Sequence, residues 1–560
     1  MAYTNFNFET DADGIALITW DTPDKSMNVL TEAALREFAA IVDQLAADDA
    51  VKGAIIASGK KNSFAGGADL AMLENLVATG RKLEREKGLE AASAHVLENG
   101  GAFARIIRKM ETCGKPVAAA INGTCMGGGY EISLGCHYRL AARHASARIG
   151  LPEAKVGLFP GGGGSQRLPR LIGASDALQL MLQGRTLRFD QALKMGMIDK
   201  IVPASRLLGE AKKWLKTVGD PVARWDRKGY RIPGGLPYSK NGMMTFTAAN
   251  AIYRRETMDN YPALRALMSC VYEGLLVDID TGLKIEARYF AHILRTPEAQ
   301  NMIRTLFLSM QALGKGARRP ASVPPTRIRK LGVLGAGMMG AGIAHVSAQA
   351  GIKVVLLDRD MAAAEKGKAH AEKLISRRVM KGRASARDRE RLLDRITPTA
   401  NYDDLKGCDL VIEAVFEDRQ IKAAVTKEAE ARLGRRAVFG SNTSTLPITS
   451  LARASSRPAH FIGIHFFSPV EKMRLVEIIM GKQTGDLALA KALDFVRAIG
   501  KTPIVVNDSR GFFTSRVVGT YISEGISLLT EGVPAAMVEN VARMAGMPVG
   551  PLALNDEVGL

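Results

Sequence analysis

Glycines in the second half of the chain have the spacing of a dinucleotide-binding loop. Gly335, Gly337 and Gly340 lie in GAGMMG, which follows the apolar run KLGVL and opens a helical pattern. Such glycines permit a tight turn and let backbone N–H groups approach a pyrophosphate at the start of the helix. Asp358 ends the next apolar run, where its carboxylate would accept hydrogen bonds from ribose hydroxyls and repel a 2′-phosphate. The pattern therefore predicts a site for NAD rather than NADP.

A histidine and a glutamate further along could form an acid–base pair. His465 and Glu477 lie in two β-like runs that the short segment SPVEKMR joins. In a hairpin centred on Glu471 the two side chains would face each other, and the carboxylate would hold and polarise the imidazole. The alternative, a core histidine with satisfied hydrogen bonds, is less favoured because a cofactor motif precedes the pair. Beside a nicotinamide, the imidazole would take the proton of an alcohol during its oxidation.

The first half of the chain places carboxylates near glycine-rich segments. In GTCMGGGYEISLG, Gly128 stands at the start of a helical pattern whose first turn carries Glu131, and Glu153 follows in LPEAKVGLFPGGGG. Backbone N–H groups at a helix start are free donors, so that of Gly128 could stabilise an oxyanion. Two carboxylates beside such a site suit the transfer of a proton and a water across an activated double bond. Spacing alone leaves a glycine-rich turn with exposed glutamates equally open.

The elements that must position these side chains alternate between strands and helices. Both blocks predict parallel sheets buried on both faces, because short apolar runs alternate with amphipathic helical runs. Residues 205–312 are mainly helical in pattern, and the Pro, Gly and basic residues of 314–327 predict a linker. The predicted strands are 14–20, 52–58, 116–123, 330–335, 353–358, 409–415 and 435–441, and the clearest helical run of the first block is 32–46.

Composition narrows the class of protein. The chain has 560 residues, 47% of them hydrophobic, and a formal net charge of +19. This apolar content excludes a largely disordered chain, and the length suggests about three or four domains. No apolar run reaches the roughly 18–20 residues that a membrane span needs. The basic excess suits polyanionic ligands, but no zinc-finger spacing or aromatic–basic RNA signature favours nucleic acid.

The cysteines and the N-terminus bear on location. The 5 cysteines are scattered, with no CxxC pair and no disulfide framework, which fits a reducing compartment. The N-terminal sequence MAYTNFNFETDADG has neither a hydrophobic signal core nor a basic transit helix. We therefore expect a cytoplasmic protein, and no metal site.

The second block resembles the L-3-hydroxyacyl-CoA dehydrogenase family. The resemblance rests on GAGMMG with its following acid, EAVFED, SNTSTLPI and HFFSPVEKMRLVEII. It implies that His465 is the catalytic base with Glu477 as its partner, and that Ser444 hydrogen-bonds the substrate hydroxyl. It further implies an NAD site lined by Met339, Asp358, Glu417, Lys422 and Ser468. Many members have asparagine at the positions of Ser468 and Ser515, and the latter is a candidate substrate contact.

The first block resembles the crotonase superfamily of enoyl-CoA hydratases and isomerases. The motifs are DKSMNVL, FAGGADL, the GGGYE helix and LPEAKVGLFPGGGGSQRLPRLIG. The resemblance implies an oxyanion hole for the thioester carbonyl, formed by the N–H groups of Ala68 and Gly128. It also implies that Glu131 and Glu153 are the acid–base pair that holds the water. The presence of both glutamates marks a hydratase, since members with only one tend to be isomerases.

Together the two blocks resemble the multifunctional α subunits of fatty-acid β-oxidation. This implies an α/β multidomain protein: a crotonase-type ββα spiral (1–204), a helical connecting region and linker (205–326), a Rossmann NAD-binding domain (327–508) and an incomplete all-helical dehydrogenase domain (509–560). The implied reactions are hydration of trans-2-enoyl-CoA to L-3-hydroxyacyl-CoA and its NAD-dependent oxidation to 3-ketoacyl-CoA. Acyl-CoA substrates, a thiolase β subunit and a second copy of the chain are the implied partners.

Some expectations keep alternatives open. Arg377 and Lys381 of ISRRVMKGR could bind CoA phosphates or could belong to a solvated helical face. Because family members run on beyond the position of LALNDEVGL, the sequence looks C-terminally truncated. One alternative is therefore a hydratase whose dehydrogenase half binds NAD but turns over poorly. Another is a non-catalytic CoA-binding scaffold for a thiolase, which the intact glutamates and histidine disfavour.

Overall fold

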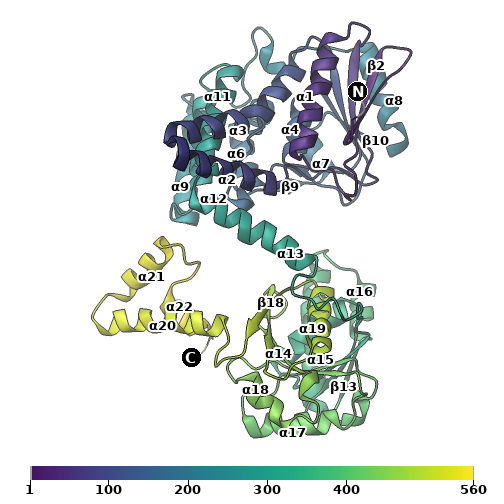
Figure 1. Ribbon diagram of the computed structural model, residues 1–560, viewed down its shortest axis with the longest axis vertical. Helices are drawn as coiled ribbons and strands as arrows, with labels where there is room; N and C mark the ends of the chain where they lie inside the picture. The colour runs from purple at the N-terminus through teal and green to yellow at the C-terminus, as the bar shows by residue number, and fades with distance from the viewer. Residues whose placement is uncertain (1–2, 559–560) are drawn as a thin grey trace. The chain divides into compact units, whose positions relative to one another are not determined.

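The computed structural model describes residues 3–558 and divides into two compact units, which we describe separately (Figure 1). Unit 1 comprises Met1–Ser309 with Arg543–Met547, and unit 2 comprises Met310–Ala542 with Pro548–Leu560. Each unit has its own hydrophobic core. None of the helices within residues 3–558 is long and apolar enough to cross a membrane.

The main sheet of unit 1 has six strands in the order β1-β2-β3-β5-β7-β10. Only the first pair is antiparallel, and the others are parallel. Alternate side chains pack on opposite faces, as the strand period of two requires: Ile55 faces α8, whereas Ile56 faces α1 and α3. The bounds are β1 Phe6–Thr10, β2 Ile15–Trp20, β3 Gly53–Ser58, β5 Val117–Ile121, β7 Tyr138–Ala142, β10 Lys200–Val202, α1 Glu32–Ala47, α3 Leu89–Glu111 and α8 Leu207–Thr217.

A small second sheet in unit 1, ordered β4-β6-β8-β9, leads into the glycine-rich segments. α4 (Gly128–Leu134) follows β6 directly and is buried along its whole length. The segment that carries Glu153 forms a single 3₁₀ turn, and a glycine-rich loop then enters α5 (Gly164–Ile172). The bounds are β4 Ser63–Ala65, β6 Thr124–Met126, β8 Ile149–Gly150 and β9 Thr186–Leu187.

Helices complete unit 1 around these sheets. α10 (Pro262–Gly274) and α11 (Ile279–Leu294) form a hairpin that packs on α5, and α11 also packs on α3. The helical character predicted for residues 205–312 is thus present. The other helices are α2 Leu70–Lys87, α6 Ala174–Leu182, α7 Phe189–Lys194, α9 Lys240–Thr257 and α12 Pro297–Met302, with a π-helical segment at Ile303–Ser309.

Unit 2 is built on an eight-stranded sheet in the order β13-β12-β11-β14-β15-β16-β17-β18. Every neighbouring pair is parallel except β16 and β17. The four strands predicted for this block are β11, β12, β14 and β15. The bounds are β11 Lys330–Leu334, β12 Lys353–Leu357, β13 Ile396–Thr399, β14 Leu410–Glu413, β15 Val438–Ser441, β16 Phe461–Phe466, β17 Leu475–Met480 and β18 Thr502–Asn507.

Helices cover both faces of this sheet, as its apolar strands require. One core cluster joins the sheet to α14 (Met338–Gln349), α15 (Met361–Met380) and α19 (Asp486–Ala498). A second cluster on the other face includes α17 (Arg419–Glu430) and α18 (Ile448–Leu451). The strand order from β13 to β16 is that of a Rossmann fold. The remaining helices are α13 Met310–Gly314, α16 Ala386–Leu393, α20 Thr514–Thr530, α21 Ala535–Met544 and α22 Pro551–Val558.

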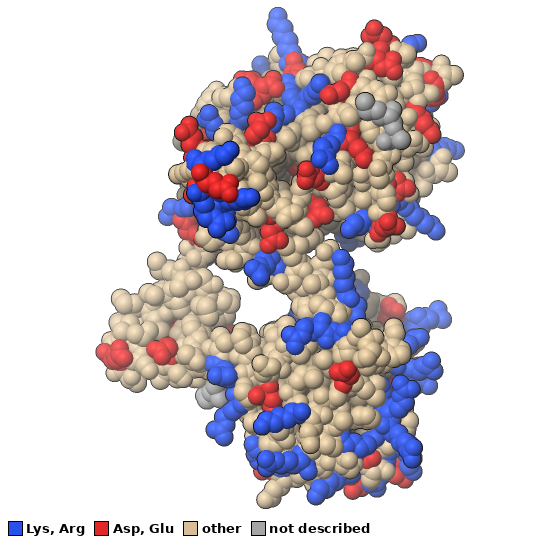
Figure 2. Space-filling model, in the orientation of Figure 1, with Lys and Arg blue, Asp and Glu red and all other residues tan. Residues whose placement is uncertain are grey.

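The segment predicted as a linker has neither helix nor strand between residues 315 and 329. It is nevertheless fixed, because Arg319 forms a bidentate ion pair with Asp494 of α19, and Thr326 donates to the same carboxylate. The basic excess of the sequence is visible on unit 2: Figure 2 shows Lys and Arg predominating over Asp and Glu around α16 and β13.

Candidate active sites

Glu131 occupies a closed position in unit 1, on the first turn of α4. Its side chain is buried, and its Oε1 accepts hydrogen bonds from the N–H groups of Gly162 (2.6 Å) and Gly164 (2.9 Å). Burial raises the pKa of this carboxyl to about 7, although the two backbone hydrogen bonds oppose the shift. A carboxyl that titrates near neutral pH can both accept and return a proton.

Glu153 lies beside the start of the same helix. A methyl group added to Gly127 would lie 3.1 Å from Glu153 Oε1, which places the carboxyl against the backbone that enters α4. Its Oε2 is buried and has no hydrogen-bond partner within residues 3–558. Burial, followed by repulsion from Glu131, raises the pKa of Glu153 well above its ordinary value. Glu153 therefore keeps its proton to higher pH than an ordinary glutamate does, whereas Glu131 titrates near neutral pH.

Two backbone N–H groups meet next to these carboxyls. A methyl group added to Gly128 would lie 3.7 Å from the amide nitrogen of Ala68, so the two N–H groups are close together. Gly127, the residue before α4, has a left-handed φ of 54° that turns the chain into the helix. Within residues 3–558 neither Ala68 N–H nor Gly128 N–H donates a hydrogen bond. Two free donors at a helix start can bind an oxyanion.

The GAGMMG segment of unit 2 forms the turn between β11 and α14. Gly335 has a φ of 93°, and a methyl group at Gly340 would collide with the carbonyl oxygen of Gly335. At Gly337 an added methyl group would meet nothing within 4 Å, and no side chain caps the start of α14. Open space above uncapped N–H groups fits a pyrophosphate. Asp358 directly follows β12 and accepts a hydrogen bond from Ala336 N–H (2.6 Å). The carboxylate that is predicted to bind the ribose therefore lies beside this turn.

His465 and Glu477 face each other across β16 and β17, as the hairpin prediction required. They are register partners in this antiparallel pair, and His465 Nδ1 lies 2.8 Å from Glu477 Oε2. Both side chains are buried. Because the carboxylate can only accept, Nδ1 carries the proton and Nε2 is the nitrogen that can take one. Within residues 3–558 Nε2 forms no hydrogen bond.

Glu477 also holds the start of α20. Its Oε1 accepts from the N–H groups of Phe513 (3.2 Å) and Thr514 (2.9 Å), and its Oε2 accepts from Thr514 Oγ1 (2.7 Å). Burial acts to raise the pKa of Glu477, but the hydrogen bonds from His465 and Thr514 outweigh it and lower the pKa below its ordinary value. Glu477 is thus a fixed negative charge that orients the imidazole.

Several other predicted residues of unit 2 converge on the loop after β15. Ser444 N–H donates to Glu417 Oε1 (3.1 Å), and Ser515 Oγ donates to the carbonyl oxygen of Ser444 (3.3 Å). Lys422 Nζ lies 3.1 Å from Glu417 Oε2 but is itself buried, and it also binds Glu413 at 3.0 Å. Lys422 is therefore anchored to the end of β14 as well as available to the site.

The remaining predicted residues are more dispersed. Ser468 is exposed and lies 3.7 Å from the sulfur of Met338. In the GAGMMG segment it is Met338 that is 65% exposed, whereas the predicted Met339 packs partly against the core. Arg377 and Lys381 are exposed at the end of α15 and form no ion pair within residues 3–558.

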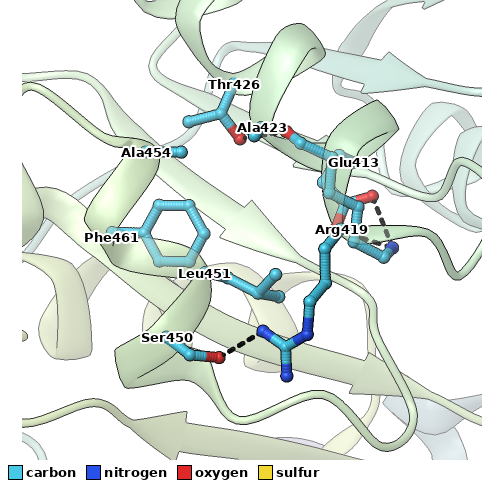
Figure 3. Close-up of a pocket in the computed structure, with 9 residues that line it drawn as sticks. Glu413, Arg419, Ala423, Thr426, Ser450, Leu451, Ala454 and Phe461 are labelled. Carbon is cyan, nitrogen blue, oxygen red and sulfur yellow. Dashed lines mark hydrogen bonds and ion pairs between the residues drawn. The ribbon is translucent and has the colours of Figure 1, made fainter.

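Unit 2 has a cavity of about 130 Å³, and the ion-paired Lys422 and Glu413 form part of its wall (Figure 3). Arg419 spans it and donates to Ser450 Oγ (2.7 Å). Neither the glycines of GAGMMG nor His465 lines this cavity. It is lined by Glu413, Arg419, Lys422, Ala423, Thr426, Ser450, Leu451, Ala454 and Phe461.

The structure also brings in residues that the sequence analysis missed. Glu286 of α11 is fully buried and binds the glycine-rich loop beside Glu131. A signal for it exists in the sequence, because Glu286 stands at helical spacing between the buried Leu283 and Phe290. Glu413 and Thr514 support Lys422 and Glu477 in the same way. Glu413 is the first residue of the EAVFED motif and Thr514 directly precedes Ser515, but the sequence analysis gave neither residue a role.

Comparisons with known proteins match both halves of the chain. The enoyl-CoA hydratase/isomerase model matches residues 10–221. The 3-hydroxyacyl-CoA dehydrogenase models match residues 330–509 for the NAD-binding domain and 511–560 for the C-terminal domain. The fatty acid oxidation complex subunit alpha of Shewanella amazonensis is 37% identical over 99% of this chain and 76% of its own length. That of Shewanella halifaxensis is 38% identical with the same coverage.

Among solved structures, (S)-3-hydroxybutyryl-CoA dehydrogenase from Ralstonia eutropha is 38% identical, with a TM-score of 0.41 over 41% of this chain and 83% of that one.

The fold and the sites define an enzyme with a crotonase domain and a Rossmann-type dehydrogenase domain, as the sequence predicts. The chain belongs to the fatty acid oxidation complex subunit alpha family. It carries enoyl-CoA hydratase and 3-hydroxyacyl-CoA dehydrogenase domains that serve β-oxidation, with NAD as cofactor and CoA thioesters as substrates. No group of His, Cys, Asp and Glu within residues 3–558 could hold a metal ion.

Proposed function

We propose that unit 1 hydrates trans-2-enoyl-CoA with Glu131 and Glu153, and that unit 2 oxidises the resulting L-3-hydroxyacyl-CoA with His465 and Glu477. The observation that carries the proposal is the convergence of two carboxyls of raised pKa on the N–H groups of Ala68 and Gly128, neither of which donates a hydrogen bond within residues 3–558. Carboxyls whose pKa is raised by burial cost folding free energy. A non-catalytic scaffold does not need them, so their presence favours an enzyme.

In the proposed hydration, the N–H groups of Ala68 and Gly128 bind the thioester oxygen as negative charge develops on it. Glu131, in its ionised form, takes a proton from water while the hydroxyl adds to the β-carbon. Glu153, in its protonated form, gives a proton to the α-carbon. The different pKa values of the two carboxyls suit these opposite tasks.

In the proposed oxidation, His465 Nε2 takes the proton of the 3-hydroxyl, while Glu477 holds Nδ1–H and stabilises the imidazolium. Ser444, at the loop joined to Glu417 and Ser515, hydrogen-bonds the same hydroxyl. The residues that would hold NAD are the GAGMMG turn, Met339, Asp358, Glu417, Lys422 and Ser468. NAD, when bound, supplies the oxidising power for this step.

The same proposal covers organisation and partners. It divides the chain into residues 1–204, 205–326, 327–508 and 509–560. The relatives are named as subunits of a complex, which supports a thiolase β subunit as partner. The proposal also includes a homodimer of the chain. It further assigns Arg377 and Lys381 to the binding of CoA phosphates. The 5 cysteines are all free, which supports a reducing, cytoplasmic location.

A two-stage assay on the purified chain tests the proposal. We would follow loss of the conjugated enoyl-thioester absorbance with a trans-2-enoyl-CoA, then add NAD⁺ and follow NADH. We expect enoyl loss followed by NADH formation. Enoyl loss without NADH would leave only the hydratase part of the proposal. A constant enoyl signal from a folded chain would contradict the assigned roles of Glu131 and Glu153.

A further inference from the structure

Glu286 is a buried carboxylate that comes from outside the segment matched by the hydratase model. It lies on α11, whereas that match ends at residue 221. Its side chain is 0% exposed and forms three hydrogen bonds: from Gly163 N–H to Oε1 (2.6 Å), and from Ser165 N–H (3.1 Å) and Ser165 Oγ (2.5 Å) to Oε2. All its partners belong to the loop that enters α5.

Glu286 and Glu131 share this loop by alternation. Successive N–H groups go to opposite carboxyls: Gly162 and Gly164 donate to Glu131, whereas Gly163 and Ser165 donate to Glu286. The loop is thus held from both sides. Consecutive N–H groups lie in adjacent peptide planes that meet at a Cα atom, so a rotation that frees one set of bonds also changes the dihedral angles that aim the other set.

Neighbouring side chains pack closely against the loop. A methyl group at Gly161 would lie 2.7 Å from the ring of Phe290 on α11. One at Gly162 would lie 2.5 Å from Phe103 of α3, and Gly163 has a left-handed φ of 98°. The glycines are therefore required by the close approach of α11 on one side and of α3 on the other.

Charged and titratable groups surround Glu286 from each neighbouring element. Glu131 of α4 and Glu153 of the 3₁₀ turn repel it, and the thiol of Cys270 on α10 contacts Ser165 Oγ at 3.4 Å. The cation that acts on it is the fully buried Arg167 of α5. Arg167 is bound by Glu111 in a bidentate pair at 3.0 Å, and it also donates to the carbonyl oxygen of Gly162. Burial, followed by repulsion from Glu131, raises the pKa of Glu286 to about 8.

We propose that Glu286 is a positioning residue for hydration: from α11 it fixes the 162–165 loop so that Gly162 and Gly164 N–H point at Glu131. The inference rests on the proposed function, because it assigns a task to the site where Glu131 and Glu153 act. If Glu286 has this task, the helical segment that contains α11 belongs to the hydratase site and does not merely connect two domains.

The charge has a consequence for pH dependence. Glu286 contributes to the raised pKa of Glu153 by repulsion. Because the pKa of Glu286 is raised to about 8, this repulsion acts at alkaline pH, and a neutral residue at position 286 removes it and favours the ionised form of Glu153. The limb of the pH–rate profile that Glu153 sets therefore shifts to lower pH. A side chain that merely filled space would not move the profile.

The test compares Glu286→Gln with Glu286→Asp, with Glu298→Gln as a control that changes an exposed glutamate of unit 1 in the same way. Glutamine can still accept from Gly163 N–H, but its NH₂ group cannot accept from Ser165. We expect Glu286→Gln to lower the hydratase kcat by about 10- to 100-fold, with the KM for enoyl-CoA within about twofold of wild type and a pH profile shifted to lower pH. Glu286→Asp keeps the charge, so its kcat falls while its profile stays in place.

Folding is checked by fluorescence, because the chain's three tryptophans, at positions 20, 214 and 225, all lie in unit 1. If Glu286→Gln fails to fold, Ser165→Ala removes only one of the bonds to Glu286 and must lower kcat by a few-fold. Wild-type kcat and pH profile in Glu286→Gln would overturn the inference, as would equal losses in both variants without a shift in the profile. An inactive wild type would instead refute the proposed function, and Glu131→Gln measured alongside separates the two failures.

Discussion

At the scale of single residues, the two sites use carboxyls in opposite electrostatic states. The carboxyls of Glu131 and Glu153 have few compensating contacts, so burial of these groups raises their pKa values. Glu477 is also buried, but four hydrogen bonds, from His465, from Thr514 Oγ1 and from two backbone N–H groups, keep it ionised. The first arrangement makes proton carriers, and the second makes a fixed counter-charge. Residue type alone does not distinguish them.

The first prediction concerns Glu131→Gln. Glutamine can keep accepting from Gly162 and Gly164 N–H, but it cannot take a proton from water. We expect hydration of trans-2-enoyl-CoA to fall by about 10²- to 10⁴-fold, with NADH formation from L-3-hydroxyacyl-CoA unchanged. Glu90→Gln, at an exposed position, is the control. Hydration that persists in Glu131→Gln would show that the acid–base assignment is wrong.

The second prediction concerns His465→Gln in unit 2, which should affect oxidation and leave hydration unchanged. In His465→Gln no nitrogen can take the proton of the 3-hydroxyl, so NADH formation should fall by about 10²- to 10⁴-fold while hydration stays at the wild-type rate. His370→Gln on α15 serves as the matched control. If hydration were lost together with oxidation, His465 would have to be a structural residue for the whole chain.

The third prediction concerns pH and stability. Glu131 has a raised pKa of about 7, against an ordinary 4.5, so the folded state binds its proton more tightly than the unfolded state. Its contribution is fully present below about pH 4.5 and is lost as pH rises through about 7. Relative to Glu131→Gln, which does not titrate, wild type should lose up to about 3 kcal/mol of unfolding free energy between pH 5 and pH 8.

Urea unfolding followed by tryptophan fluorescence measures this change in unit 1. The quantity to compare is the difference between wild type and Glu131→Gln at the two pH values, because groups whose pKa does not depend on Glu131 cancel in it. Glu90→Gln should show no such difference. A pH-independent gap between wild type and Glu131→Gln would mean that Glu131 is ionised throughout and that burial does not govern its pKa.

At the scale of elements, two glycines of GAGMMG have different tasks: Gly340 allows α14 to pack close to the turn, and Gly337 leaves space for NAD. Gly340→Ala puts a methyl group into the Gly335 carbonyl oxygen, so α14 must move off β11. We expect unit 2 to lose about 1–3 kcal/mol of unfolding free energy, and NAD binding with it. Gly337→Ala meets nothing within 4 Å, so stability should be kept while NAD binding weakens by about tenfold or more.

Circular dichroism melting and a titration with NAD⁺ measure the two effects separately. Tryptophan fluorescence should report an unchanged transition for unit 1 in both variants. Tight NAD binding by Gly337→Ala would place the pyrophosphate elsewhere, and unchanged stability in Gly340→Ala would contradict the close contact between α14 and the turn.

The elements also show what could be predicted from the sequence. The strands predicted around GAGMMG and Asp358 are present because apolar runs of this length, bounded by glycine and acid, have few other ways to be buried. The His465–Glu477 pairing follows from strand period and hairpin length. Glu286 was missed because its partners lie more than a hundred residues away in the loop before α5; its helical spacing indicates burial but does not indicate which groups it binds. Lys422 was placed in the NAD site, but its bond to Glu413, the first residue of EAVFED, depends on how β14 and α17 pack, which the motif does not show.

At the scale of the whole molecule, each activity is assigned to a unit with its own core and its own complete set of residues. Glu131, Glu153, Ala68, Gly128 and Glu286 all belong to unit 1, and the His465–Glu477 pair and the GAGMMG turn belong to unit 2. The assignments therefore imply that damage to one site leaves the other intact, even within one polypeptide.

The last prediction follows from this separation. Neither Glu131→Gln nor His465→Gln alone should convert trans-2-enoyl-CoA and NAD⁺ to NADH, because each lacks one of the consecutive steps. An equimolar mixture should recover NADH formation, since the hydroxyacyl-CoA released by the intact hydratase of one chain can reach the intact dehydrogenase of another. Wild type at the same concentration of working sites is the reference. Recovery with a lag absent from wild type would indicate that the intermediate passes through solution only in the mixture, whereas no recovery would mean that the two sites do not work independently.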